Sequence, residues 1–284
     1  GDEGLTLHQL QRAELPLPLV LFRLALTHLH QRGVVFSGRL PWGETVYVVP
    51  SDVRAAWLRV ALPCDGTTRD ESIELTRQAP YGVLHDLFHL LVMMDHMEVK
   101  LTGHGTIHQR IQQKMNVELE TPAETFQGAD WLIGKEDDVT AFHIVFHLAE
   151  RAQLIRKVSK QKIEVAQKYL CSWLNQSHQE ATSALYREVK RAFLSTYPRD
   201  AAIVWWMEQQ SCWVDVREMA MFWMQQLARP VRRWPSFADN WTKKWLEPLY
   251  GLGWIDWGES RFGTVWRWSA NAPFTAVEKA PVLE

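Results

Sequence analysis

Two pairs of histidines have the spacing of metal ligands on a helix. His85 and His89 lie four residues apart in HDLFH, and His143 and His147 lie four apart in HIVFH, one turn before Glu150. A spacing of four puts both imidazoles of a pair on one helix face, so two pairs on antiparallel helices could close a zinc site, with carboxylates as ligands or orienters. Each pair can also simply flank an apolar stripe at a helix boundary. We favour this second interpretation and predict that the four histidines do not share a metal.

The sequence lacks the common signatures of catalysis. HDLFH has no glutamate at the position that the HExxH peptidase motif requires, and neither a GxSxG nucleophile motif nor a GxxxxGK[ST] phosphate loop occurs. Cys171, in YLCSWL, is expected to be a small core residue. We therefore predict that the chain is not an enzyme and uses no cofactor.

The composition is that of a soluble globular chain. Its 284 residues are 46% hydrophobic and 23% charged, and 31 basic and 33 acidic residues give a net charge of −2. Nucleic-acid binding would therefore need a local basic patch rather than overall charge. Three cysteines without a CxxC motif favour a reducing compartment. No apolar stretch approaches the roughly 20 residues of a membrane span, so we expect a cytoplasmic protein without a membrane partner.

Positive charge gathers in stretches that could hold phosphates. RKVSKQK begins at residue 156, and ARPVRRWP begins at residue 228 with a lysine pair close behind near residue 243. A further basic patch contains Arg187, Lys190 and Arg191. Arginine interleaved with tryptophan suits backbone neutralisation combined with base stacking. The same residues can also form solvated helix faces above core indoles, or contact a protein partner. The candidate nucleic-acid-binding residues are Arg156, Lys157, Lys160, Arg229, Arg232, Arg233, Trp234, Lys243 and Lys244.

The first third of the chain predicts two helices followed by a hairpin. Leucines at helical spacing cover residues 5–13 and 17–32, and Gly33 ends the second helix. The β-branched runs VVFSG and ETVYVVP, on either side of a Pro/Gly turn, predict an antiparallel hairpin between residues 34 and 50. Helix, helix and a two-stranded wing is the winged-helix order. Ser51 then begins a further predicted helix that ends at Pro63.

The middle of the chain is predicted to be almost entirely helical. Residues 64–80 are charged and hydroxyl-rich without apolar periodicity, which indicates a linker. A helix follows, then a strand in VKLTGHG and a second helix through Met115. Residues 139–197 form a third helical block, in which Ser177 caps the last helix before Pro198.

The last part of the chain repeats the opening pattern with tryptophan as its main apolar residue. Eleven of the 15 tryptophans follow residue 200, which indicates a core built of indoles. Helices are predicted up to Gly251, and WIDWGES and GTVWRWS predict a second hairpin. The predicted fold is mostly α with winged-helix-like units at both ends. Its units are residues 1–64 (N-terminal winged-helix-like), 65–200 (helical middle with a second helix-strand-helix unit) and 201–284 (C-terminal Trp-rich winged-helix-like).

Several segments resemble one protein family. LVMMDHMEVKLTGHGTIHQRIQQKM, YLCSWLNQSHQEATSALYREVKRAF and the ending LEPLYGLGWIDWGES…GTVWRWS are similar to a bacterial helicase-associated region like the N-terminal domain of XPB-type helicases. The likeness lies in apolar spacing and glycines and covers most of the chain. His108 and Gln109 stand where the family pattern favours residues such as lysine. The resemblance implies a winged-helix-like module that accompanies a helicase, positions nucleic acid or binds a partner, and performs no chemistry.

These observations favour a non-enzymatic module that binds nucleic acid, DNA rather than RNA, or a helicase-type protein partner. Two alternatives remain open. One is a helical metalloprotein that uses the paired histidines, and the other is a winged-helix scaffold for protein–protein contacts.

Replacing Arg229, Arg232 and Arg233 together with alanine tests the most basic of these stretches. We expect affinity to fall about equally for every nucleic-acid sequence. The slope of log affinity against log salt should flatten by roughly 0.9 per lost contact on duplex DNA and about 0.7 on single strands, because fewer counterions are released. Titrations of single- and double-stranded oligonucleotides at several salt concentrations measure both. Unchanged affinity and slope would identify the arginines as solvated charge.

Overall fold

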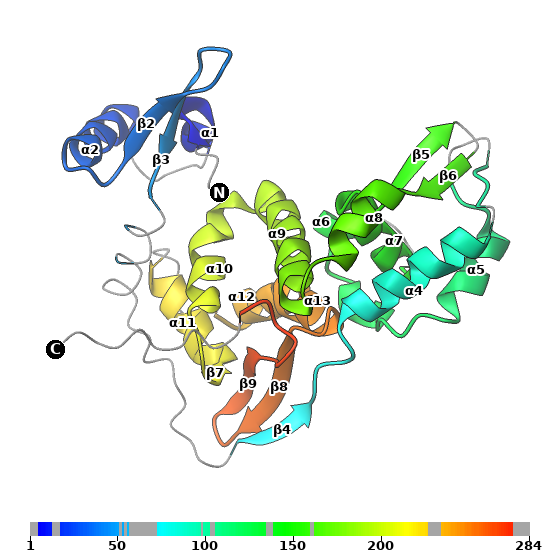
Figure 1. Ribbon diagram of the computed structural model, residues 1–284. Coiled ribbons are helices and arrows are strands. Elements are labelled where there is room, and N and C mark those ends of the chain that lie inside the picture. The colour runs from blue at the N-terminus through cyan, green and yellow to red at the C-terminus, as the bar shows by residue number, and fades with distance from the viewer. Residues whose placement is uncertain are drawn as a thin grey trace. The chain divides into compact units, whose positions relative to one another are not determined.

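The computed structural model describes residues 5–12, 18–50, 53, 56, 73–97, 99–102, 106–134, 139–159, 162–226 and 234–274. The chain divides into two compact units, residues 1–65 with 197–209, and residues 66–196 with 210–284. Both contain helices, and the fold is mostly α with small antiparallel sheets, as the sequence predicts (Figure 1). No helix within the described residues has the length and apolarity needed to cross a bilayer.

The first unit contains the predicted N-terminal hairpin. Strands β2 and β3 pair antiparallel, and β1 pairs with the other edge of β3. Gly33, at φ +70°, ends the preceding helix as predicted, because this backbone conformation favours glycine. The helix predicted from Ser51 to Pro63 lies almost wholly outside the described residues. The elements are β1 (Leu5–Thr6), α1 (Leu7–Arg12), α2 (Leu19–Gln31), β2 (Phe36–Arg39), β3 (Thr45–Val48), η2 (Pro198–Asp200) and α10 (Ala201–Glu208).

A hairpin that the sequence analysis missed interrupts the helices of the second unit between α7 and α8. Residues 139–197 were expected to be helical throughout, yet β5 and β6 pair antiparallel within them. The hairpin forms because Ile155, Ile163 and Val165 bury one of its faces. The predicted Ser177 cap of α9 is confirmed, since its hydroxyl accepts a hydrogen bond from the Glu180 amide at 3.2 Å. The elements are α4 (Val83–His96), α5 (Gln109–Asn116), η1 (Ala123–Phe126), α6 (Asp130–Ile133), α7 (Ala141–Arg151), β5 (Ile155–Ser159), β6 (Lys162–Val165), α8 (Gln167–Leu174) and α9 (His178–Thr196).

The second half of the second unit forms a four-stranded sheet with the order β4-β8-β9-β7. The predicted hairpin in WIDWGES and GTVWRWS is confirmed as β8 and β9. A π-helix, η4, joins α12 to α13 within the stretch predicted as one helix. The elements are β4 (Glu74–Arg77), β7 (Val214–Asp215), α11 (Val216–Gln226), α12 (Trp234–Trp241), η4 (Thr242–Leu246), α13 (Glu247–Gly251), β8 (Ile255–Ser260) and β9 (Gly263–Trp268).

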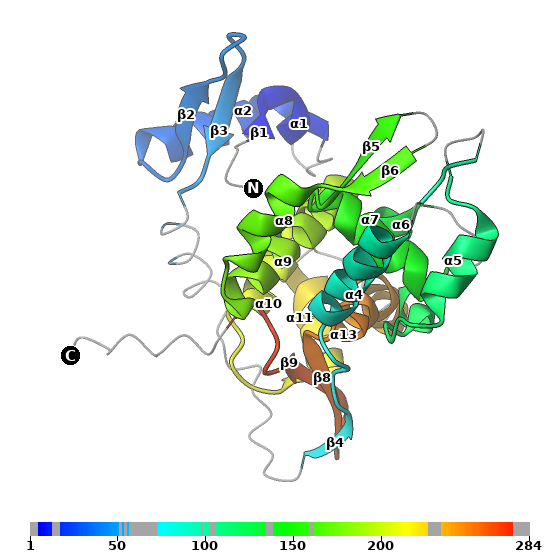
Figure 2. The same ribbon diagram turned by 45° about the vertical axis from the view of Figure 1, so that its right-hand side comes forward.

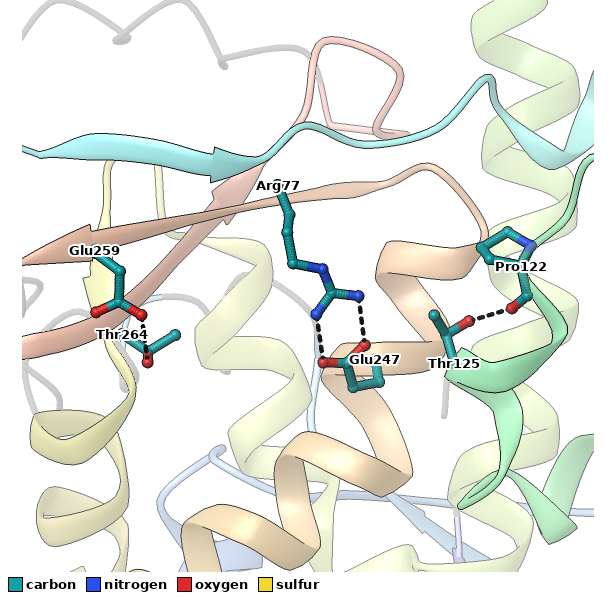
Figure 3. Close-up of polar contacts among 6 residues, drawn as sticks. All are labelled: Arg77, Pro122, Thr125, Glu247, Glu259 and Thr264. Carbon is teal, nitrogen blue, oxygen red and sulfur yellow. Dashed lines mark hydrogen bonds and ion pairs between the residues drawn. The ribbon is translucent and has the colours of Figure 1, made fainter.

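Strand β4 corrects the prediction that residues 64–80 are a linker. β4 pairs with β8, and the Arg77 guanidinium donates two hydrogen bonds, of 2.9 and 3.2 Å, to the Glu247 carboxylate (Figure 3). The Asp256 carboxylate accepts a further one from the Ala79 amide at 2.9 Å. A segment of the expected middle region therefore shares a sheet with the expected C-terminal unit. The three-part division of the chain stays a prediction.

The second unit has an aromatic core. Trp245 is fully buried, and its ring centroid lies 4.2 Å from that of Phe193 and 5.6 Å from that of Trp131. Trp241 packs against the same phenylalanine at 5.6 Å. These contacts join α6, α9, α12 and η4, and offset or tilted ring pairs of this kind add stability beyond the apolar area that they bury.

Replacing Trp245 with alanine should lower the free energy of unfolding by about 3–5 kcal/mol, because it removes a fully buried aromatic side chain and leaves a cavity. Urea unfolding followed by far-UV circular dichroism measures the change. The control is Trp42→Ala, since Trp42 is 72% exposed and its loss should shift stability by no more than about 0.5 kcal/mol. Equal losses in the two variants would contradict the aromatic core.

Candidate nucleic-acid interface

The hairpin of β5 and β6 presents two of the predicted basic residues. Arg156 and Lys157 are exposed on β5. Arg156 lies opposite Glu164 on β6, and Lys157 lies opposite Ile163. Because successive side chains of a strand point to opposite faces, the two basic residues lie on different faces of the hairpin.

A third segment extends the hairpin on the Arg156 side. Lys100 forms an antiparallel bridge with Lys162 of β6, so the two lysines lie directly opposite each other. Lys162 forms an ion pair with Glu164 at 2.5 Å, which places both on the same face as Arg156. We call Lys100, Arg156, Lys162 and Glu164 the hairpin face. It carries three positive charges and one negative charge. Like charges directly opposite each other on neighbouring strands repel, so a bound anion would stabilise this face.

Lys157, on the other face, belongs to a different electrostatic environment. The Glu150 carboxylate, at the end of α7, lies 3.6 Å from His147 Nδ1. A hydrogen bond from His147 lowers the pKa of Glu150, and the nearby charges of Lys157 and Arg151 lower it further. Lys157 is therefore placed next to a carboxylate that stays ionised, which partly screens its charge.

Lys243 and Lys244 lie on η4, away from the hairpin. Lys243 is exposed and Lys244 is half-buried. The Lys244 carbonyl accepts a hydrogen bond of 2.8 Å from Trp131 Nε1, and the Lys243 backbone lies so close to Gly128 that a Cβ there would meet the Lys243 oxygen at 2.5 Å. A π-helix releases carbonyls from the regular helical ladder, which accounts for the bond to the indole.

The predicted basic residues whose side chains the structure describes lie in two separate places. The β5–β6 hairpin packs against α4 and α7, whereas η4 packs against α12, α13 and η1. Figure 1 and Figure 2 show the hairpin separated from α13 in both views. Two separate basic surfaces result, and each carries two of the predicted basic residues that the structure describes. Lys160, Arg229, Arg232 and Arg233 lie outside the described residues, as does the side chain of Trp234.

The paired histidines have local partners instead of a common centre. The His143 ring bonds to Thr140 at 3.1 Å in a capping box at the start of α7, and His147 lies beside Glu150. The His85 and His89 rings lie 6.0 Å apart on α4. In the part of the chain that the structure describes, no three His, Cys, Asp or Glu residues come together as metal ligands would. That the histidines do not share a metal stays a prediction.

Two other residues differ from expectation. Cys171 is exposed rather than in the core, because α8 buries none of its residues. Lys100 was not among the predicted site residues, although it contributes to the hairpin face. The sequence signal for Lys100 was the strand predicted in VKLTGHG. The strand with which it pairs, β6, lies in a stretch that was expected to be helical.

Comparisons with known proteins give no relative for this chain. No family model, no curated protein and no solved structure matches it.

Replacing His147 with alanine should raise the pKa of Glu150 toward its ordinary value of 4.5, because the hydrogen bond that favours the carboxylate is lost. Carboxyl-carbon NMR titration measures this pKa. Since the folded-state pKa is lowered, the interaction stabilises the protein above the unfolded-state pKa, and this contribution is lost as pH falls through the folded-state value. Lys157→Ala should raise the pKa less. An unchanged pKa in the His147 variant would contradict the assignment.

Proposed function

We propose that the chain is a non-enzymatic module that binds nucleic acid through winged-helix units, with the hairpin face as the principal phosphate contact. The observation that carries the proposal is the placement of Lys100 directly opposite Lys162, beside Arg156, on one face of a projecting hairpin. Lysine and arginine neutralise phosphates and release counterions on binding. Such contacts position a protein on nucleic acid without reading its sequence.

A shared connectivity supports the winged-helix interpretation. In the first unit, β1 is followed by helices and the β2–β3 hairpin, and β1 pairs with β3. Near the chain's end, β7 is followed by helices and the β8–β9 hairpin, and β7 pairs with β9. In each case a short strand, helices and a hairpin follow in order, and the short strand pairs with the second strand of the hairpin.

The middle of the chain has the same order. The bridge segment at Lys100 is followed by α5, α6, α7 and the β5–β6 hairpin, and it pairs with β6. The sequence analysis expected winged-helix-like units only at the two ends, whereas this connectivity favours a third in the middle. The basic hairpin face belongs to this third unit.

The hairpin, and not helix α7, is proposed to contact the phosphates. The half-buried positions along α7 include His143, Phe146 and His147 rather than lysine or arginine. A two-stranded ribbon fits the major groove of B-form DNA, whereas the major groove of A-form RNA is too narrow for side chains to read. Duplex DNA is therefore the preferred ligand. A cytoplasmic location and a helicase-type partner complete the proposal, on the strength of the cysteines and the family resemblance.

Replacing Arg156 and Lys162 with alanine removes two positive charges of the hairpin face and should weaken duplex binding about equally for all sequences. The slope of log affinity against log salt should flatten by up to roughly 1.8, because each lost phosphate contact accounts for about 0.9 on duplex DNA. Fluorescence anisotropy of a labelled duplex over a series of salt concentrations measures both. Lys100→Ala should add to the effect without changing sequence preference.

The matched control replaces Arg187 and Arg191, two exposed arginines of α9, and removes the same charge. It should leave the salt slope unchanged. If both double variants flatten the slope equally, binding depends on overall charge and the hairpin is not the site.

A further inference from the structure

Helix α2 is apolar on the side that faces away from its own unit. None of its residues is buried, and Val20, Leu24 and Leu21 are 75%, 69% and 51% exposed. At 3.6 residues per turn, these three side chains fall on one side of the helix, which we call the outer stripe. The half-buried Phe22 and Leu26 fall on the opposite side.

A surface helix normally turns its apolar stripe toward the core of its own domain. In contrast, α2 leaves the outer stripe exposed, and an isolated helix of 13 residues is only marginally stable in water. We therefore expect a partner to cover the outer stripe when the protein functions.

Exposed apolar side chains also continue beyond α2. Among described residues, seven of the fifteen large hydrophobic side chains that are exposed lie between residues 19 and 42, whereas Val35 and Val46 are the buried ones between residues 5 and 50. Large exposed apolar patches are typical of interaction sites, and three of these side chains form the outer stripe. The seven are Leu19, Val20, Leu21, Leu24, Leu29, Phe36 and Trp42.

The charges of α2 determine which kind of partner fits. The helix contains Arg23, His28 and His30, Arg32 follows at its C-terminal cap, and it has no aspartate or glutamate. A second copy of α2 would bring arginines against arginines, and two arginines are too few to attract an anionic lipid surface strongly. An acidic partner pairs with these arginines while its apolar residues cover the outer stripe.

We infer that α2 docks an amphipathic helix of another protein, whose apolar face covers Val20, Leu21 and Leu24 and whose acidic flanks face Arg23 and Arg32. Helix-against-helix recognition of this kind uses anchors at spacings of three and four residues. The inference is independent of nucleic-acid binding, because it concerns the first unit and not the hairpin face.

The test uses the full chain and two synthetic amphipathic peptides with the same leucine-rich face, one with glutamate flanks and one with lysine flanks. Fluorescence anisotropy should show the glutamate peptide binding at least about tenfold more tightly than the lysine peptide, since opposite charges select the partner. Leu24→Glu should weaken the glutamate peptide by at least about tenfold, because it puts a charge into the apolar contact. R23E/R32E should reverse the preference between the peptides.

The control is Val117→Glu, at a position 82% exposed in the turn after α5, which should leave peptide binding unchanged. R156A/K162A should also leave it unchanged, so failure of nucleic-acid binding and failure of this inference are distinguishable. Far-UV circular dichroism confirms that each variant is folded.

Several results would overturn the inference. Equal binding of the two peptides, binding of neither, or binding unaffected by Leu24→Glu would each do so. A dimer in sedimentation analysis that Leu24→Glu dissociates would assign the stripe to a second copy. Association with phosphatidylserine vesicles that is lost in the same variant would assign it to lipid. Failure of a thiol reagent to modify the new side chain in Leu24→Cys would show that another part of this chain covers the outer stripe.

Discussion

The tilted packing of Trp245 against Phe193 is the contact on which the second unit depends. It joins η4 to the long helix α9, and Trp131 completes the cluster from α6. Among the described residues, the Nε1 atoms of Trp241 and Trp245 are buried without a hydrogen-bond partner, which carries an energetic cost. Indoles are retained there because their bulk and ring contacts fill the space between helices, and these gains offset the unsatisfied N–H groups.

The aromatic cluster also determines where the basic hairpin lies. α6 packs against both α7 and α9, and α7 leads directly into β5. The base of the hairpin is anchored by Ile155, Ile163 and Val165, so its outer face is left for charged residues. A rigid core therefore supports a charged edge, and the opposition of Lys100 and Lys162 is fixed by the backbone rather than by flexible side chains.

The sequence predicted correctly those elements that are determined by residues close together in the chain. The β2–β3 and β8–β9 hairpins, the helix end at Gly33 and the Ser177 cap follow from alternation, turn residues and capping side chains. Sequence reasoning failed where a distant partner decides the structure. β4 is a charged stretch that becomes a strand only by pairing with β8, and the alternation of β5 and β6 is hidden among lysines. The hairpin face was found only in part, because Lys100 reaches it through tertiary pairing.

The pairing of β4 has a consequence for how the protein is made. The Ala79 amide and the Asp256 carboxylate that it binds are separated by 177 positions in the chain. During synthesis, β4 leaves the ribosome long before its partner strand, β8, has been made. Until then, β4 is an unpaired strand. Contacts of such large sequence separation slow folding, and unpaired edges invite association with other chains. β4 carries two charged side chains, Glu74 and Arg77, and such charges oppose association of an unpaired strand with other chains until β8 has been made.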